Sequence, residues 1–280
     1  MSLTTVETGI SEHAAVLEPG AIQGRSPWQL AWARFRRDRV GIVSAIVIVL
    51  LALMAILAPV IAHVVGHGAE TQYPDTGLTP DGLPMGPGTN GFPFGTDNLG
   101  RDVLVRVVYG TRISLLVGVV ATLLATVAGV VVGLVAGYFS GAVDTVIARF
   151  MDAVLSFPYV LFAIALVSVF GASLPISVLV IAFFSWAAIG RIVRGQTLSI
   201  REREYVEAAR SLGAGDLRIM FVDILPNLVA PVIVLASLLI PTAIVFEATL
   251  SFLGLGVVPP TPTWGNMLSD SQDYYQVAWW

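Results

Sequence analysis

Five long apolar runs limit what this 280-residue chain can fold into. They are rich in Val, Leu, Ile, Ala and Gly, and they lie at about 40–65, 113–138, 152–171, 175–194 and 228–252. A helix needs roughly 20 apolar residues to cross the hydrocarbon core of a bilayer. Only 12% of the residues are charged, about half of the roughly 25% typical of a soluble domain. The sequence therefore predicts an all-α, polytopic transmembrane helical bundle with five visible spans.

The arginines indicate how the bundle is oriented. All 15 basic residues are arginine, and 12 of them lie in segments that are cytoplasmic if the N-terminus is inside. Only Arg101, Arg106 and Arg112 then lie outside. Because cytoplasmic loops carry the excess of positive charge, we expect the N-terminus to be cytoplasmic. The loops at 66–110 and 254–278 would face outward, and the polar segment 195–226 would face the cytoplasm.

Two residue types are missing, and each absence excludes a kind of chemistry. The chain has no lysine, so it cannot carry an ordinary Walker A loop for ATP, nor form a Schiff base. It has no cysteine either, which excludes disulfides and thiol chemistry. We therefore expect no ATP site and no enzymatic activity in the chain itself.

The N-terminal segment precedes the transmembrane domain, which we place at 40–280. Residues 1–25 are predicted to be a disordered cytoplasmic tail. Residues 26–39 are predicted to be an interfacial helix that Ser26 and Pro27 begin. Its apolar residues recur at helical spacing and four arginines accompany them, as a membrane-surface helix requires: Trp28, Ala31, Trp32 and Phe35, with Arg34, Arg36, Arg37 and Arg39. The alternative is the polar flank of the first span. Anionic lipid explains these arginines better than nucleic acid does.

The segment EYVEAARSLGAGDLRIMFVDILP, residues 204–226, is a polar insert between two apolar runs. Ser199 and Glu202 fit a capping box that begins a helix over 200–212, and Gly213 ends it. Asp216 can cap a second short helix that ends before Pro226. The insert is therefore predicted to be a helical hairpin. Its small residues Ala208, Ala209 and Gly213 would let another surface approach closely. An ordinary solvated loop is the alternative reading of these residues.

Within this insert, the spacing of a few residues resembles the EAA signature of ABC-importer permease subunits. The residues that match are Glu207, Ala208, Ala209, Gly213, Leu225 and Pro226, and Arg210 lies beside them. The general pattern has Ile two residues before the Leu, where this chain has Asp223. The resemblance implies that the loop docks into a groove on a cytoplasmic ATPase, with these residues and Arg210 as the coupling site.

Further segments resemble the dipeptide/oligopeptide/nickel branch of that family, and the C-type subunit of a dipeptide or oligopeptide permease most of all. They are Phe94–Asp97, Gly100–Asp102, Tyr109–Gly110, Asp152–Pro158, Phe246–Gly256 and Pro260–Gly265, and the resemblance covers about 30–275. Such subunits usually have a sixth span after the outer Trp-containing loop. We expect either that the sequence lacks this span or that the architecture has five spans with an external C-terminus, and we favour the first.

Ionisable residues inside spans cost free energy when they are placed in the bilayer, and they usually have a function. Glu247 is a candidate for lining the translocation path, and a structural hydrogen bond to a neighbouring helix is the alternative. Asp152 is expected to be structural and to pair with Arg149 or Arg191.

The loop ahead of the second span contains other candidates. Asp97, Arg101 and Asp102 could face a substrate-binding protein, or they could order the loop by ion pairing. His63 and His67 lie four residues apart, but two histidines without a third ligand are weak evidence of a metal site, and we predict none.

Together these observations predict a permease subunit that forms half of the translocation pathway for di- or oligopeptides. The resemblance implies a heterodimer with a second permease subunit, two cytoplasmic ATPase domains that bind ATP and Mg, and an extracytoplasmic substrate-binding protein, in a bacterial inner membrane. Nickel or another small solute is the alternative cargo. An autonomous secondary transporter or channel is the alternative class, but it would require more spans with ionisable residues.

Overall fold

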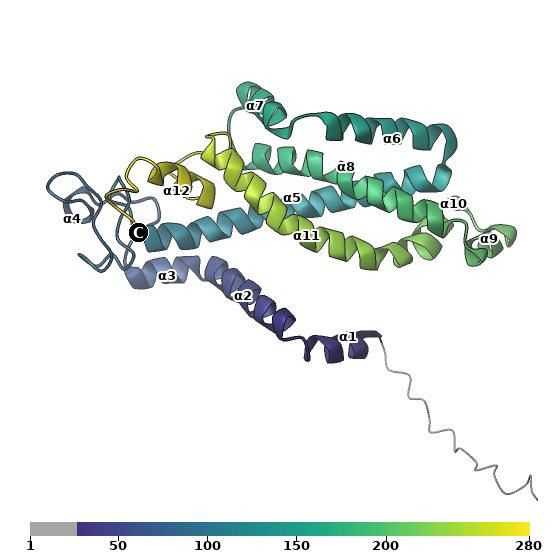
Figure 1. Ribbon diagram of the computed structural model, residues 1–280, viewed down its shortest axis with the longest axis horizontal. Coiled ribbons are helices and arrows are strands. Elements are labelled where there is room, and N and C mark those ends of the chain that lie inside the picture. The colour runs from purple at the N-terminus through teal and green to yellow at the C-terminus, as the bar shows by residue number, and fades with distance from the viewer. Residues whose placement is uncertain (1–26) are drawn as a thin grey trace, which may run out of the picture. The chain divides into compact units, whose positions relative to one another are not determined.

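The computed structural model describes residues 27–280, which form two compact units that divide at Leu50 and Leu51. The predicted tail at 1–25 and Ser26 lie outside the described residues. The described chain is helical, and its extended contacts are three isolated β-bridges in the long loop (Figure 1). The predicted all-α fold class is therefore confirmed.

The first unit contains α1 (Pro27–Phe35) and most of α2 (Arg39–Ile56). Asp38 separates the two helices, and its Oδ1 accepts a hydrogen bond from the Val40 amide at 3.0 Å. The predicted first span at 40–65 is interrupted at Leu57, and α3 (Ala58–Val65) follows. Pro59 in the first turn of α3 explains the break, because proline cannot donate the helical hydrogen bond and its ring crowds the preceding turn.

In the second unit, α5 (Val103–Phe139), α8 (Leu174–Ile200) and α11 (Leu225–Phe252) pack together as the central layer (Figure 1). A stripe of glycines at every fourth position of α5, Gly129, Gly133 and Gly137, faces α8. A Cβ atom on Gly133 would lie 2.5 Å from the carbonyl oxygen of Gly190. Since residues four apart share one helix face, this stripe lets the two backbones approach closely.

The helix that contains the predicted second span starts earlier than that span. Helix α5 begins at Val103, ten residues before the predicted start at 113. Asp102 is its N-cap, and the carboxylate accepts a hydrogen bond from the Val105 amide at 3.0 Å. This cap satisfies one of the free amides of the first turn, so the helix extends through residues that the sequence analysis assigned to the loop.

The predicted third span at 152–171 is two helices, α6 (Gly141–Ser156) and α7 (Tyr159–Phe170), bent by 85°. Pro158 causes the corner, since the residue before a proline is pushed to extended conformation and Phe157 has φ −81° and ψ 132°. In the described chain, four helices are long and apolar enough to cross a membrane, or five if this bent pair is one span.

Two ion pairs hold α6 against α8. The Arg194 guanidinium binds both carboxylate oxygens of Asp144, and Arg191 lies 2.5 Å from Asp152. The prediction that Asp152 pairs with Arg149 or Arg191 is therefore confirmed for Arg191. The remaining helices are α4 (Pro74–Gly77), α9 (Glu204–Ser211), α10 (Asp216–Arg218) and α12 (Trp264–Ser271).

Candidate functional site

The polar insert forms a hairpin, residues 201–224, that projects from the end of α8 (Figure 1). The predicted capping box is wrong, because Ser199 lies in the last turn of α8, which continues to Ile200. Arg201 ends that helix, and its Nη1 donates to the carbonyls of Gly137 and Tyr138 at 3.3 and 3.2 Å. A cation at carbonyls that end a helix is electrostatically favourable. This contact fixes the base of the 201–224 hairpin to the end of α5.

The first arm of the hairpin is α9, which ends as its sequence predicts. Gly213 has φ +81°, its amide donates to the Arg210 carbonyl, and the Ala214 amide donates to the Ala209 carbonyl. These two bonds form a Schellman motif, which needs a left-handed residue that glycine adopts at no steric cost. The predicted stop at Gly213 is confirmed.

The second arm differs from the prediction at both of its ends. Gly215, not Asp216, is the N-cap of α10, and the Asp216 carboxylate instead accepts the Tyr138 hydroxyl at 2.7 Å. The arm does not end before Pro226 but continues through a π-helical turn, η1 (Ile219–Ile224), into α11. The Leu225 amide donates to the Met220 carbonyl, five residues back. This wider turn relieves the clash that Pro226 would cause in an α-helix.

The two arms are joined by an apolar core. Val206 and Ile219 are fully buried there, and Ala209 and Leu225 pack against the same cluster. Ala209 and Leu225, sixteen residues apart in sequence, therefore share one apolar cluster. Of the other predicted coupling residues, Glu207, Ala208, Arg210, Gly213 and Pro226 are exposed.

Two exposed leucines at the tip of the hairpin were missed by the sequence analysis. Leu212 is 88% exposed and Leu217 is 69% exposed, on either side of the Gly213–Gly215 turn. The sequence could have predicted their exposure, because leucines that flank a glycine-rich turn in a polar insert have no apolar core beside them in which to pack. The tip therefore offers an apolar surface surrounded by charge.

Glu247 lies inside α11 and is fully buried. Its Oε2 accepts the Ser114 hydroxyl of α5 at 2.8 Å, and its Oε1 accepts the Ser251 hydroxyl at 2.7 Å. Ser114 also accepts from the Trp264 amide at 3.5 Å, and Ser251 from the Val257 amide at 3.3 Å. These bonds match the alternative in which Glu247 makes a structural hydrogen bond to a neighbouring helix. A role of Glu247 in the translocation path stays a prediction.

Asp97, Arg101 and Asp102 are all inside the folded loop, with exposed fractions of 5%, 3% and 0%. Asp97 Oδ2 lies 2.6 Å from Arg101 Nε and 3.3 Å from Arg106 Nε. These contacts match the alternative in which ion pairs order the loop. A direct contact with a binding protein stays a prediction that this burial does not support.

His67 also belongs to this folded loop. Its Nδ1 lies 2.7 Å from Asp102 Oδ2, and its ring stacks on Phe92 with centroids 4.3 Å apart. Among the described residues there is no group of three or more side chains of metal-ligating type. His67 thus supports the residue that caps α5.

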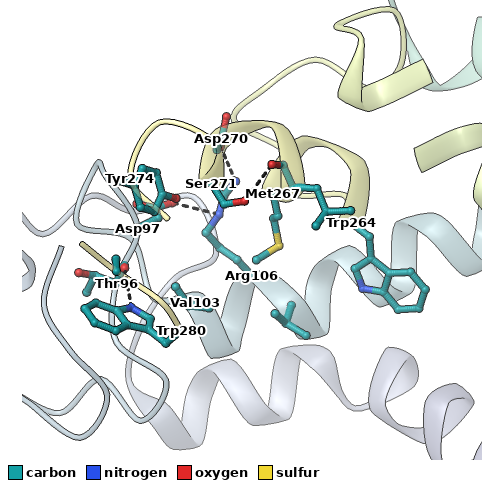
Figure 2. A pocket seen from close by; sticks show the side chains of 13 residues that line it. Thr96, Asp97, Val103, Arg106, Trp264, Met267, Asp270, Ser271, Tyr274 and Trp280 are labelled. Atoms are coloured by element: carbon teal, nitrogen blue, oxygen red, sulfur yellow. Dashed lines mark hydrogen bonds and ion pairs between the residues drawn. The ribbon is translucent and has the colours of Figure 1, made fainter. Parts of the chain in front are cut away.

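Arg106 was missed as a site residue. It is only 1% exposed and lines a cavity of about 450 Å³ between the start of α5 and α12 (Figure 2). Tyr274 borders the same cavity, and burial, followed by the nearby charges of Asp97 and Asp270, raises the pKa of its phenol to about 12. The Tyr274 hydroxyl is therefore neutral and able to donate.

Comparison with known proteins agrees with this architecture. Residues 129–279 match the family described as the binding-protein-dependent transport system inner membrane component. Residues 26–80 match the N-terminal TM domain of oligopeptide transport permease C.

Relatives match over most of their length. The oligopeptide transport system permease protein OppC of Escherichia coli K12 is 46% identical over 92% of this chain and 83% of its own. The dipeptide transport system permease protein DppC of Alkalihalophilus pseudofirmus is 41% identical, over 91% and 81%. The glutathione transport system permease protein GsiD of Escherichia coli O6:K15:H31 is also 41% identical, over 89% and 80%.

A bundle of membrane-spanning helices with a projecting polar hairpin thus defines a multi-pass membrane permease. The chain belongs to the family of inner membrane components of binding-protein-dependent transport systems, in the branch that contains the oligopeptide and dipeptide permeases. It is accordingly a permease subunit of an ABC importer in a bacterial inner membrane.

Proposed function

We propose that this subunit forms half of a pathway that imports dipeptides or oligopeptides, and that the 201–224 hairpin couples it to cytoplasmic ATPases. The exposed apolar tip of the hairpin carries this proposal. Leu212 and Leu217 are exposed, with Glu207 and Arg210 on the surface beside them. Large apolar residues exposed on a polar insert are typical of a surface that a partner covers.

The anchoring of the hairpin supports a role in transmitting force. Arg201 and Asp216 fasten its two arms to the end of α5, and Val206 and Ile219 join the arms to each other. The glycine stripe packs α5 tightly on α8. Closure of ATP-bound ATPases would therefore displace α5 and α8 together and switch the pathway between inward-open and outward-open states.

The partners in this proposal are a second permease subunit, two ATPase domains that bind ATP and Mg, and a substrate-binding protein outside. The chain itself holds no cofactor in this proposal, and hydrolysis takes place in the ATPases. Its 15 basic residues are all arginine, so it has no lysine for a Walker A loop. Peptides are the favoured cargo because the relatives above include proteins named for oligopeptide and dipeptide transport.

The test uses the complex of this chain with its permease partner and ATPases in liposomes. We expect a double variant, Leu212→Asp and Leu217→Asp, to lower ATP-dependent peptide uptake at least tenfold and to release the ATPase during purification. Glu207→Arg should have the same direction of effect. Leu83→Asp is the matched control, since Leu83 is a 41% exposed leucine in the long loop before α5 and is not part of the 201–224 hairpin.

The outcomes separate coupling from cargo. Unchanged uptake and an ATPase that still co-purifies with the double variant would refute the coupling role. Uptake of nickel or another small solute, with none of labelled di-, tri- or tetrapeptides, would refute the peptide assignment while leaving the coupling role in place.

A further inference from the structure

The cavity beside Arg106 has the composition of a binding site. Its volume of about 450 Å³ is in the range of small-molecule pockets, which are mostly apolar with a few polar groups that fix orientation. The apolar walls come from the first turns of α5 and from α12, and they include Val103, Val107, Met267 and Leu268 (Figure 2). The polar groups converge at one end, where Arg106 and Asp270 lie.

Arg106 has hydrogen-bonding capacity that the protein does not use. Its Nη1 donates to the carbonyls of Ala69 and Pro260 at 3.2 and 3.3 Å, and its Nε lies 3.3 Å from Asp97. Its Nη2 lies 3.8 Å from Asp270 Oδ2, and no acceptor among residues 27–280 is within hydrogen-bonding distance of it. A guanidinium carries five N–H donors, so Nη2 in the cavity wall can donate to a bound ligand.

Asp270 provides the complementary acceptor. Its side chain is 30% exposed, and its Oδ2 lies 3.1 Å from Arg101 Nη2. Two arginines and two aspartates, Arg101, Arg106, Asp97 and Asp270, form this cluster, and their formal charges cancel. A charged group would meet a charge of its own sign beside the opposite one, whereas a neutral group with one acceptor and one donor would fit both. A peptide group is such a ligand, because its carbonyl accepts from Arg106 and its amide donates to Asp270.

We propose that this cavity binds a short peptide, with an apolar side chain between α5 and α12 and a backbone amide on Arg106 and Asp270. The proposal rests on the peptide import proposed above. The loops that form the cavity are the ones that the arginine distribution predicts to face outward, where a delivered peptide would first meet the subunit. The site would therefore favour peptides that carry an apolar residue.

The test is photo-cross-linking on the assembled permease complex in nanodiscs, without the substrate-binding protein. The probe is a tripeptide that carries p-benzoylphenylalanine at its centre, and mass spectrometry locates the modified residue. We expect the modification on α12 or the first turns of α5, with competition by Ala-Leu-Ala. Ala-Glu-Ala should compete at least tenfold less well.

Two variants test the two halves of the site. Met267→Trp fills the cavity and should abolish the competed cross-link, whereas the control Leu123→Trp, at a 60% exposed position of α5 outside the cavity, should not. Asp270→Ala removes the acceptor and should weaken competition by about fivefold, the worth of one hydrogen bond. Melting temperatures of the variants identify any loss through misfolding.

The outcomes distinguish this site from the proposed function. A complex that imports peptides but gives a competed cross-link elsewhere, or keeps it in Met267→Trp, overturns the site and leaves peptide import intact. A wild-type complex that gives no competed cross-link in the cavity overturns the site whatever the uptake assay shows. A cross-link in the cavity from a complex that imports no peptide would support the site and refute the proposed function.

Discussion

The Tyr138 hydroxyl, in the last turn of α5, donates to the Asp216 carboxylate in the first turn of α10 at 2.7 Å. These residues are 78 positions apart, and their bond joins a long central helix to the tip of the 201–224 hairpin. Together with the bonds from Arg201 to the same end of α5, it gives the hairpin two attachment points.

Removing this bond should loosen the hairpin without unfolding the bundle. We expect Tyr138→Phe to cost about 1 kcal/mol, the typical worth of one hydrogen bond, and to reduce uptake per ATP hydrolysed. Asp216→Asn should act in the same direction, and the double variant should be no worse than Tyr138→Phe alone. Thermal unfolding and coupled transport assays in liposomes measure both effects. Additive losses in the double variant would show that the two side chains act independently.

The glycine stripe of α5 makes a second prediction. A methyl group on Gly133 would lie 2.5 Å from the Gly190 carbonyl oxygen and 2.9 Å from Val193 Cβ. Gly133→Ala should therefore lower stability by about 1–3 kcal/mol, because backbone atoms must separate. Gly195→Ala on α8 is the control, since no atom lies within 4 Å of its added methyl, and it should be neutral or slightly stabilising. Equal melting temperatures for the two variants would contradict close packing at this stripe.

A third prediction concerns Asp102, which caps α5 and contacts His67. Asp102→Asn keeps an acceptor for the Val105 amide but removes the charge beside His67, whereas Asp102→Ala removes both. We expect Asp102→Ala to cost about 1–2 kcal/mol and Asp102→Asn clearly less. Proteolysis of the loop at 66–102, followed over time, measures local opening. A loop that is cleaved equally fast in both variants would show that the cap contributes little.

Local signals predicted some elements of this structure well. Gly213 ends α9, and this stop could be predicted because it depends on the backbone conformation of a single residue. The partner of Asp152 was narrowed to two arginines, of which the structure has Arg191. The break at Pro158 was also readable, since the restriction on the preceding residue is local. The sequence analysis instead placed Pro158 inside one continuous span at about 152–171.

Other features depend on contacts between distant segments. The early start of α5 requires Asp102 to cap the helix while His67 holds the carboxylate from 35 residues away. Ser199 lies inside α8 because Arg201, two residues later, finds the carbonyls at the end of α5. The burial of Arg106 likewise needs acceptors from Ala69 and Pro260, which are 37 and 154 positions away. No pattern within a helical turn or two contains this information.

Glu247 allows a structural and a transport role to be separated. Its two carboxylate oxygens each accept a serine hydroxyl, and those serines accept amides from Trp264 and Val257. If the residue serves as a hydrogen-bonding centre, a neutral side chain of the same shape should replace it. Glu247→Gln should therefore retain more than about half of the uptake, because its carbonyl still accepts from one serine and a serine hydroxyl can accept from its amide.

Removing the hydrogen bonds at this position should have a much larger effect. Glu247→Leu leaves the Ser114 and Ser251 hydroxyls without their acceptor, and we expect a loss of about 2–4 kcal/mol from two buried donors. The hydrogen bond from the Trp264 amide to Ser114 should then weaken, and α12 should separate from α5. Limited proteolysis of the segment 254–280 would detect this separation. Uptake that is abolished in Glu247→Gln while the melting temperature is unchanged would instead assign the charge a role in translocation.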